Sequence, residues 1–120
     1  GNNVDINVNP SISTTFTFNY NDHNQKLLVN PQSFSAVGVN TTSSIITINN
    51  HGFRTGDKIL HTSTNPAQGL QNNSTYFIVK VNNDSFKLSN TYYDSIQLKP
   101  SIVGIASTSN GNLSLINPFL

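Results

Sequence analysis

The sequence predicts an all-β protein, a small barrel or sandwich of about seven short strands with an extended N-terminal arm. Strong helix formers are scarce, because the 120 residues include three alanines and no glutamate. Nineteen valines and isoleucines supply side chains that suit a pleated, half-buried surface. Apolar residues also alternate with polar ones over short stretches that end at asparagine, glycine or proline. Together these observations favour strands throughout.

Residues 1–34 are expected to form the arm, or the end of a preceding module. Apolar residues recur there at a period of two, which predicts two strands. They are Val4, Ile6 and Val8, then Phe16, Phe18 and Tyr20. A polar turn over residues 21–26 and the Asn30-Pro31 step interrupt the chain afterwards. Two strands are marginal on their own, so the arm is expected to pack on something else.

Residues 35–120 are expected to form one β module. Short apolar runs bounded by turn residues predict its strands. These strands are expected at 36–39, 44–48, 58–61, 75–81, 85–88, 102–106 and 113–115. The tight loop Asn82-Asn83-Asp84 predicts a hairpin, and Asn110-Gly111 predicts a type I′ turn between the last two strands. A single helical turn is expected within residues 90–96.

Composition and charge exclude several classes of function. The net charge is +1 and 9% of the residues are charged, so nothing favours a nucleic-acid or anionic-lipid partner. Cysteine is absent, which excludes a disulfide framework, a thiolate zinc site and a cysteine nucleophile. The sequence has neither an apolar run of roughly 18 residues nor a signal-peptide pattern, so no membrane partner is expected. Asn, Ser and Thr make up 47 residues, a neutral surface typical of extracellular or virion proteins.

The most informative stretch runs from His51 to Ile59, between two predicted strands. Its two glycines, four residues apart, predict backbone positions where a side chain would clash, and Asp57 is expected to bond a nearby backbone N–H. Phe53 is expected to fill the end of the barrel, and His51 to bond a backbone carbonyl. The stretch therefore predicts a structural corner, whose residues are His51, Gly52, Phe53, Thr55, Gly56 and Asp57.

This corner resembles the first catalytic cysteine half-domain of ubiquitin-activating enzymes, whose pattern is a strand, then His-Gly-aromatic-x-Thr-Gly-Asp, then a hairpin. Residues 44–59 match it closely, and residues 76–81 and 85–95 match its later strands and turn. A similar module occurs in tail, baseplate, fibre and other structural proteins of bacteriophages. The resemblance covers about 80 of the 120 residues, and residues 1–34 have no counterpart. It implies a scaffold rather than a carrier of catalytic residues, and the adenylation machinery of activating enzymes is absent.

Several residues are of types that could bind a metal or take part in catalysis, but simpler structural roles explain them better. His51, Asp57 and His61 carry donor types that zinc accepts, but their spacing matches no recognised site. On an extended strand His61 would lie roughly 13 Å beyond Asp57. Asp84 and Asp94 occupy predicted turns, so they are not expected to form a carboxylate pair for catalysis. We therefore expect no enzyme activity, no catalytic residues, no cofactor and no metal.

The expected function is that of a virion structural protein, a phage tail, baseplate, fibre or head-surface component, that acts through assembly with copies of itself or other virion proteins. Apolar arm residues and the chain's last residues are expected to contact partners by strand addition or insertion into a pocket. The expected partner contacts are Val4, Ile6, Val8, Phe16, Phe18, Tyr92, Tyr93, Phe119 and Leu120. The alternatives are a receptor- or glycan-binding module of an adhesin or fibre tip, or a subunit of an extracellular filament.

Overall fold

A computed structural model of the chain describes residues 28–117. The elements are β1 (Leu28–Phe34), η1 (Ala36–Gly38), β2 (Val39–Asn40), β3 (Ile45–Thr47), β4 (Lys58–Thr62), β5 (Ser74–Asn82), β6 (Ser85–Ser89), α1 (Tyr92–Ser95) and β7 (Gly111–Ile116). The two strands expected between residues 1 and 20, and the expected contacts at Phe119 and Leu120, lie outside the described residues.

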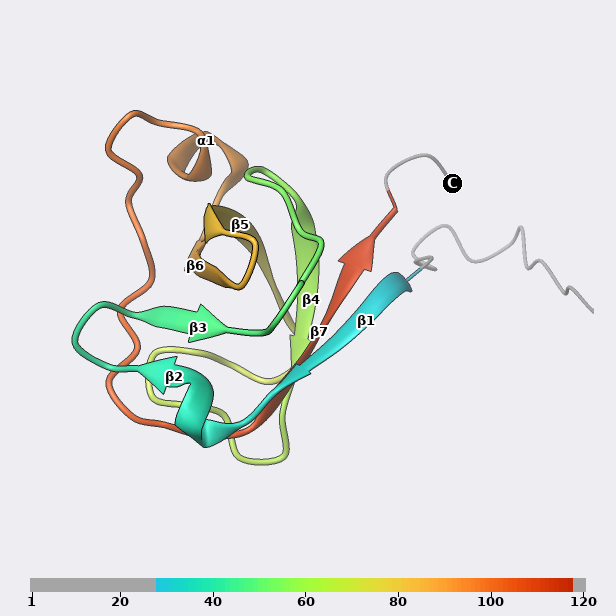
Figure 1. Cartoon of the computed structure of the whole chain (residues 1–120), viewed down its shortest axis with the longest axis vertical. Helices are drawn as coiled ribbons and strands as arrows, with labels where there is room; N and C mark the ends of the chain where they lie inside the picture. Colours follow the sequence, from blue (N-terminus) through green and yellow to red (C-terminus); the bar gives the residue numbers. More distant parts are fainter. Residues whose placement is uncertain (1–27, 118–120) are drawn as a thin grey trace, which may run out of the picture.

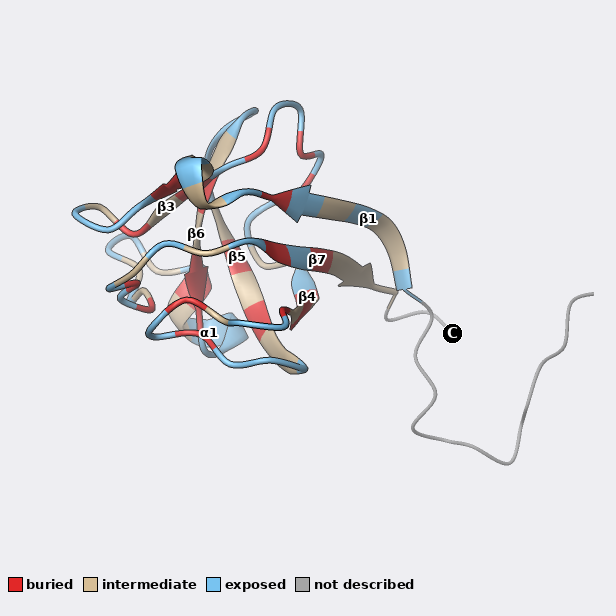
Figure 2. Cartoon of the chain, turned by 90° about the horizontal axis from the view of Figure 1, so that it is seen from below, coloured by how far each residue is buried: buried red, intermediate tan, exposed pale blue. Residues whose placement is uncertain are grey.

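The seven strands form one antiparallel sheet in the order β1-β7-β4-β5-β6-β3-β2. The sheet curls around its core, and α1 lies beside β5 and β6 at one end (Figure 1). Strands β1 and β7 run side by side at one edge of the sheet (Figure 2), and residues 112–115 of β7 also pair with β4. The all-β architecture predicted from composition is confirmed.

Alternating residues of the central strands build the core, as strand geometry requires. Ile78 of β5 lies opposite Leu88 of β6, and both side chains are fully buried. Ile59 and Leu113, from β4 and β7, are equally buried in the same cluster. The red bands on the strands mark these inward positions (Figure 2). The inward side of the curled sheet therefore forms one hydrophobic core.

Two short elements match the sequence-based expectation closely. The hairpin predicted around Asn82-Asn83-Asp84 is formed by β5 and β6. The helical turn expected within residues 90–96 is α1, which begins after Thr91; the Thr91 side chain accepts a hydrogen bond from the backbone N–H of Asp94 at 3.1 Å. The hairpin prediction rested on residues that stabilise tight turns locally, whereas the cap at Thr91 is a feature that the structure adds.

The prediction of a strand at residues 36–39 is wrong for the first three residues, which form the 3₁₀ turn η1. Only Val39 continues into β2, where it lies opposite Ile46. At Gly38 the backbone approaches β3 so closely that an added Cβ would lie 2.9 Å from the carbonyl oxygen of Thr47. The chain turns here to cross from one edge of the sheet to the other.

The strand expected at residues 102–106 is also wrong. Val103 and Ile105 are buried in the core, which explains their apolar pattern. Their backbone groups, however, bond to three separate neighbours: Val103 N–H to Leu88 O, Ile105 N–H to Ser44 Oγ, and Ala106 N–H to Gln68 O. The segment therefore crosses the open side of the curled sheet and covers the core there without pairing as a strand.

The type I′ turn predicted at Asn110-Gly111 is not formed, because Gly111 is the first residue of β7 and lies opposite Phe34. An added Cβ would overlap the Phe34 ring and lie 2.9 Å from Nε2 of His61. Glycine at this position is required for close packing, not for a turn. Without a strand at 102–106, β7 pairs with β1 and β4 instead.

The boundary between arm and module was expected between residues 34 and 35, but the sheet already begins with β1 at Leu28. Residues 28–34, assigned to the arm, pair with β7, and Phe34 is buried in the core. The Asn30-Pro31 step, expected as a break, lies inside the strand as a bulge between Val29 and Gln32, with Asn30 at a φ of 49°. A bulge accommodates the two residues without ending the strand.

Candidate functional site

The corner predicted at residues 51–57 connects β3 to β4, and His51 fixes its backbone. Nδ1 of His51 accepts a hydrogen bond from the Phe53 N–H at 2.9 Å. Nε2 therefore carries the proton, and it lies 2.8 Å from the carbonyl oxygen of Asn82 at the end of β5. Because both ring nitrogens are engaged, this fully buried imidazole pins two chain segments together and has no free nitrogen for a metal or a substrate.

The two glycines of the corner have different roles. Both adopt left-handed backbone, with φ of 76° at Gly52 and 93° at Gly56, where other residues are strained. At Gly56 space is also limiting, because an added Cβ would lie 2.9 Å from Cε1 of Tyr92. Gly56 therefore allows the Tyr92 ring of α1 to pack flat against the corner.

Asp57 and Thr55 use their side chains on backbone groups. Oδ2 of Asp57 accepts from the Arg54 N–H at 2.8 Å, as the sequence predicted for this turn. Oγ1 of Thr55 accepts from the Lys80 N–H at 2.9 Å, and the N–H of Gly56 donates to Ile78 O. Both bonds tie the corner to β5. The polar residues of the corner thus satisfy backbone groups, and Phe53 fills the core beneath them with 1% of its surface exposed.

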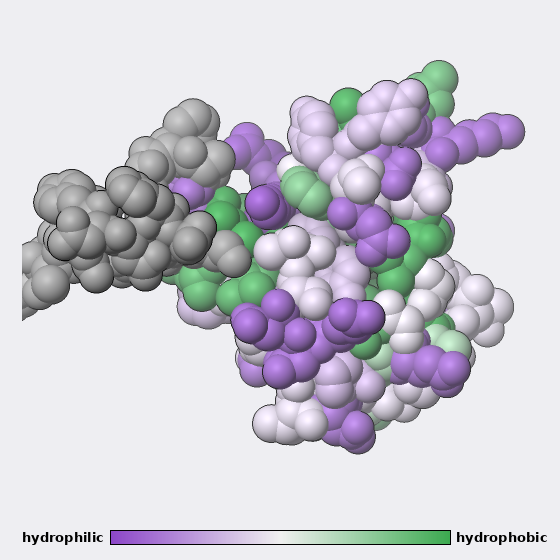
Figure 3. All heavy atoms as spheres, turned by 180° about the vertical axis from the view of Figure 1, so that it is seen from behind, coloured by the Kyte–Doolittle hydropathy of each residue, from purple (hydrophilic) through white to green (hydrophobic). Residues whose placement is uncertain are grey.

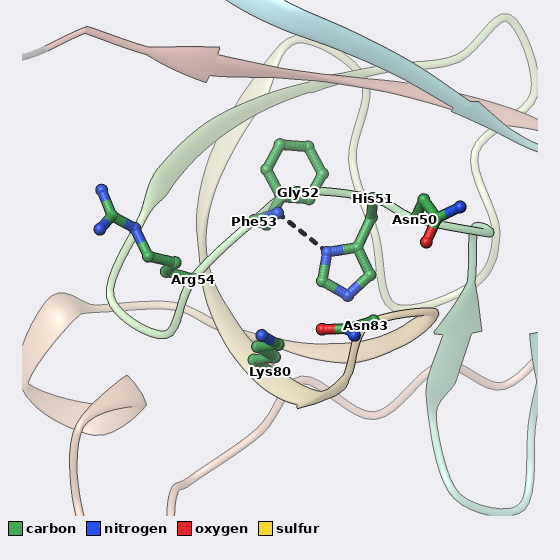
Figure 4. Close-up of a pocket in the computed structure, with 7 residues that line it drawn as sticks. All are labelled: Asn50, His51, Gly52, Phe53, Arg54, Lys80 and Asn83. Carbon is green, nitrogen blue, oxygen red and sulfur yellow. Dashed lines mark hydrogen bonds between the residues drawn. The ribbon is translucent and has the colours of Figure 1, made fainter.

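A hollow of about 220 Å³ lies beside the corner, next to the β5–β6 turn. Its seven described lining residues include two cations, Arg54 and Lys80, and no carboxylate. Figure 4 shows that the Arg54 side chain points away from His51 and Asn83, so the cations do not converge on one point. This hollow therefore does not present a cluster of charged groups to a ligand.

His61, which the sequence set apart from the corner, lies in the core on β4. Its Nδ1 donates to the carbonyl of Gln71 at 2.9 Å, and the Tyr76 hydroxyl accepts from the Gln71 N–H at 2.9 Å. These two bonds anchor the loop between β4 and β5. Nε2 of His61 is buried and has no partner among residues 28–117. Burial away from water lowers the pKa of His61, with the hydrogen bond to Gln71 opposing that shift.

Tyr92 and Tyr93, the aromatic pair expected to form an exposed patch, differ in how they are held. Tyr92 is 55% exposed and meets Phe77 edge-on, with ring centroids 6.3 Å apart. Tyr93 is 69% exposed. Phe77 itself is half-buried on β5 and contacts Tyr92. The pair therefore combines one tyrosine packed on the sheet with one that projects into solvent.

A groove of about 550 Å³ with a mainly apolar lining, which we call the β1–β7 groove, lies beside the corner. Its apolar side chains are Val29, Phe77, Tyr92, Leu115 and Ile116, and its rim includes Arg54, Asp57 and Lys58. The groove therefore lies between the β1–β7 pair, α1 and the corner. In the space-filling view, hydrophobic residues form several separate patches on a face that is otherwise mostly neutral or hydrophilic (Figure 3).

Sequence reasoning missed this groove, although a signal for it exists. Adjacent apolar residues on a strand point to opposite faces, so one of each pair must lie outside the core. Tyr76-Phe77 and Leu115-Ile116 are such pairs. Tyr76 is in the core and Phe77 lines the groove, whereas Leu115 and Ile116 both line it and Leu115 also packs against the core. Reading these pairs as doubly apolar strands would have predicted a second apolar surface.

Residues 28–117 contain no group of three or more histidines or acids that could hold a metal ion. In the same range no helix is long and apolar enough to cross a membrane. Comparisons of the chain with protein-family models, with characterised proteins and with solved structures found no match. The half-domain resemblance of the corner stays a prediction.

Proposed function

We propose that this chain is a non-enzymatic structural component of a virus particle, and that it works by assembling with copies of itself or with other particle proteins. The observation that carries this proposal is the β1–β7 groove. A contiguous apolar groove on an otherwise neutral protein surface is typical of a contact site. The surface rich in Asn, Ser and Thr adds support for a particle exterior.

The use of polar groups in the fold supports a structural rather than a catalytic role. Both ring nitrogens of His51 are hydrogen-bonded to backbone groups. The side chains of Asp57 and Thr55 accept hydrogen bonds from backbone N–H groups. Nucleophilic or acid–base catalysis needs a titratable group within reach of a bound substrate. Within the described chain, the imidazoles of both His51 and His61 are fully buried.

Two measurements test the proposal. Mass spectrometry of purified particles from the source, followed by imaging of the particles, should find the chain in stoichiometric amounts at a defined position. Sedimentation equilibrium of the purified chain over a wide concentration range should show reversible association. A chain that is absent from particles and monomeric at every concentration would contradict the proposal.

Binding of a receptor or glycan is the second candidate, and the exposure of Tyr93 favours it. Flat aromatic rings that project into solvent suit contact with a sugar or another polar partner that has an apolar face. A glycan array should then show binding that Tyr93→Ala removes while association is retained. Because the Tyr92 ring is packed against Gly56 and Phe77, Tyr93→Ala is the cleaner variant.

A further inference from the structure

The edges of the sheet are poorly suited to the strand addition that open sheets otherwise invite. β2, at one edge, has two residues. β1, at the other, contains Pro31, which has no N–H to donate, and a bulge between Val29 and Gln32. Short strands, prolines and bulges are the features by which proteins protect sheet edges from pairing. Contacts with a partner are therefore expected to use side chains rather than backbone pairing.

The β1–β7 groove offers a place for such side chains. Its floor is apolar, with half-buried residues from β1, β5 and β7, and Leu115 packs against the core from below. A volume of about 550 Å³ is in the range of pockets that enclose a small ligand. It can accept aromatic side chains, which bury roughly 150–250 Å² each.

The chain outside the described residues contains a segment with matching chemistry. Residues 14–20, Thr-Thr-Phe-Thr-Phe-Asn-Tyr, carry no charge, and Phe16 and Phe18 fall on one side of the segment if it is extended. Val29, at the groove, is the second described residue after this segment. The ten steps from Phe18 to Leu28 span at most about 36 Å, so the segment can reach beyond its own groove.

We propose that the β1–β7 groove binds the Phe16–Tyr20 segment of a second copy of this chain. The inference rests on the proposed function and names its contact. Binding to the same molecule would require the chain to reverse its direction within residues 21–27, which connect the segment to β1. Binding to a neighbour requires no reversal. The aromatic side chains then insert into the groove, in the way that short apolar anchors occupy recognition grooves.

Variants of the 120-residue chain with either the groove or the segment altered give the first test. Ile116→Asp places a charge in the groove, and Phe16→Asp/Phe18→Asp places charges in the segment. Each should raise the dissociation constant measured by sedimentation about tenfold or more. Val37→Asp is the matched control, because Val37 is 96% exposed on η1 and does not line the groove. Circular dichroism melting checks that the groove variant still folds.

Mixing the two variants separates contacts between molecules from contacts within one. A copy with the altered groove still has a native segment, and a copy with altered phenylalanines still has a native groove. If the segment binds a neighbour, each variant alone is monomeric, and an equimolar mixture forms a heterodimer. A mixture that stays monomeric would overturn the inference, since it would mean that each groove is filled by its own chain or by neither segment.

A photo-crosslink gives a second measurement that leaves the groove unchanged. A benzoylphenylalanine at position 18, in a mixture of nitrogen-15-labelled and unlabelled chains, should yield crosslinks between isotopically different chains at residues of the groove. Crosslinks within one chain only, or to another surface, would overturn the inference. If the chain associates but the groove variants do not weaken it, the inference fails while the proposed function stands. A monomeric chain absent from particles would remove both.

Discussion

Two histidines are fully buried in similar aromatic surroundings and differ in whether both ring nitrogens are hydrogen-bonded. His51 stacks on Phe53 with ring centroids 5.7 Å apart, and His61 stacks on Phe34 at 6.0 Å. Both nitrogens of His51 have backbone partners. Nε2 of His61 has none within the described part of the chain.

The difference shows how a fold decides what a buried imidazole does. A histidine bonded at both nitrogens acts as a cross-link between backbone segments, and removing it leaves two buried groups unsatisfied. A histidine bonded at one nitrogen anchors a loop but keeps a lone pair that water would otherwise solvate. The His51 corner is therefore expected to contribute more to stability, and the His61 site to respond more to pH.

The largest expected effect is that of His51→Ala. The change creates a cavity beside Phe53 and leaves the Phe53 N–H and the Asn82 carbonyl without their partner. We expect a loss of about 3–5 kcal/mol in the free energy of unfolding, measured by urea denaturation followed by circular dichroism. His61→Ala is the comparison and should lose less, because only the Gln71 carbonyl is orphaned. Equal losses would contradict the distinction between the two sites.

Gly111→Ala tests how tightly the His61 site is packed. The added methyl group would overlap the Phe34 ring and crowd Nε2 of His61. Overpacking of this kind should destabilise the fold by about 1–3 kcal/mol. Gly104→Ala is the matched control, because an added Cβ there meets nothing within 4 Å, and its effect should stay within about 0.5 kcal/mol. Thermal melting of both variants would show the contrast as a difference in Tm.

The pH dependence of stability should identify His61. Its pKa in the folded protein is lowered by burial, so the unfolded chain binds more protons once the pH falls below about 6.5. The contribution of His61 to stability is then complete above that pH and is lost progressively as the pH falls toward the lowered pKa. Urea denaturation from about pH 8 to pH 5 measures the slope. In His61→Phe this slope should be shallower, and an unchanged slope would assign it elsewhere.

Asp57→Ala should have the smallest effect, about 0.5–1.5 kcal/mol, since it removes one hydrogen bond to the exposed Arg54 N–H. Asp94→Ala is the matched control, since the bond at the start of α1 uses the Thr91 hydroxyl and the Asp94 backbone. Chemical denaturation of both would show whether the turn at Asp57 adds to the corner independently of His51. A loss as large as that of His51→Ala would mean that the corner unfolds as a unit.

Local signals in the sequence predicted much of this architecture. The β5–β6 hairpin, α1 and the His51–Phe53 and Asp57–Arg54 hydrogen bonds follow from residues close together in the chain. The errors arose where distant packing decided the outcome. Gly111 resembles a turn glycine locally, yet its neighbours are Phe34 and His61. Residues 102–106 have the apolar pattern of a strand, but the chain bonds to three different segments instead of one.

The candidate site was predictable only in part. The corner could be interpreted from its nine consecutive residues only in part: the bonds within it join residues two or three positions apart, whereas those that tie it to β5 are long-range. The β1–β7 groove draws its lining from strands 28–34, 74–82 and 111–116 and from α1. No pattern in the sequence specifies that β1 pairs with β7, since the two strands are separated by most of the module. That pairing depends on the absence of a strand at 102–106.

The crossing segment at residues 101–106 has a consequence for how the molecule opens. Its backbone bonds go to β6, to Ser44 and to Gln68, so losing one does not weaken the others as it would in a ladder. If residues 101–106 detach transiently, water reaches Val103 and Ile105 while the seven paired strands stay intact. Its amide hydrogens should accordingly exchange with deuterium well before those of β5, through a local opening rather than global unfolding.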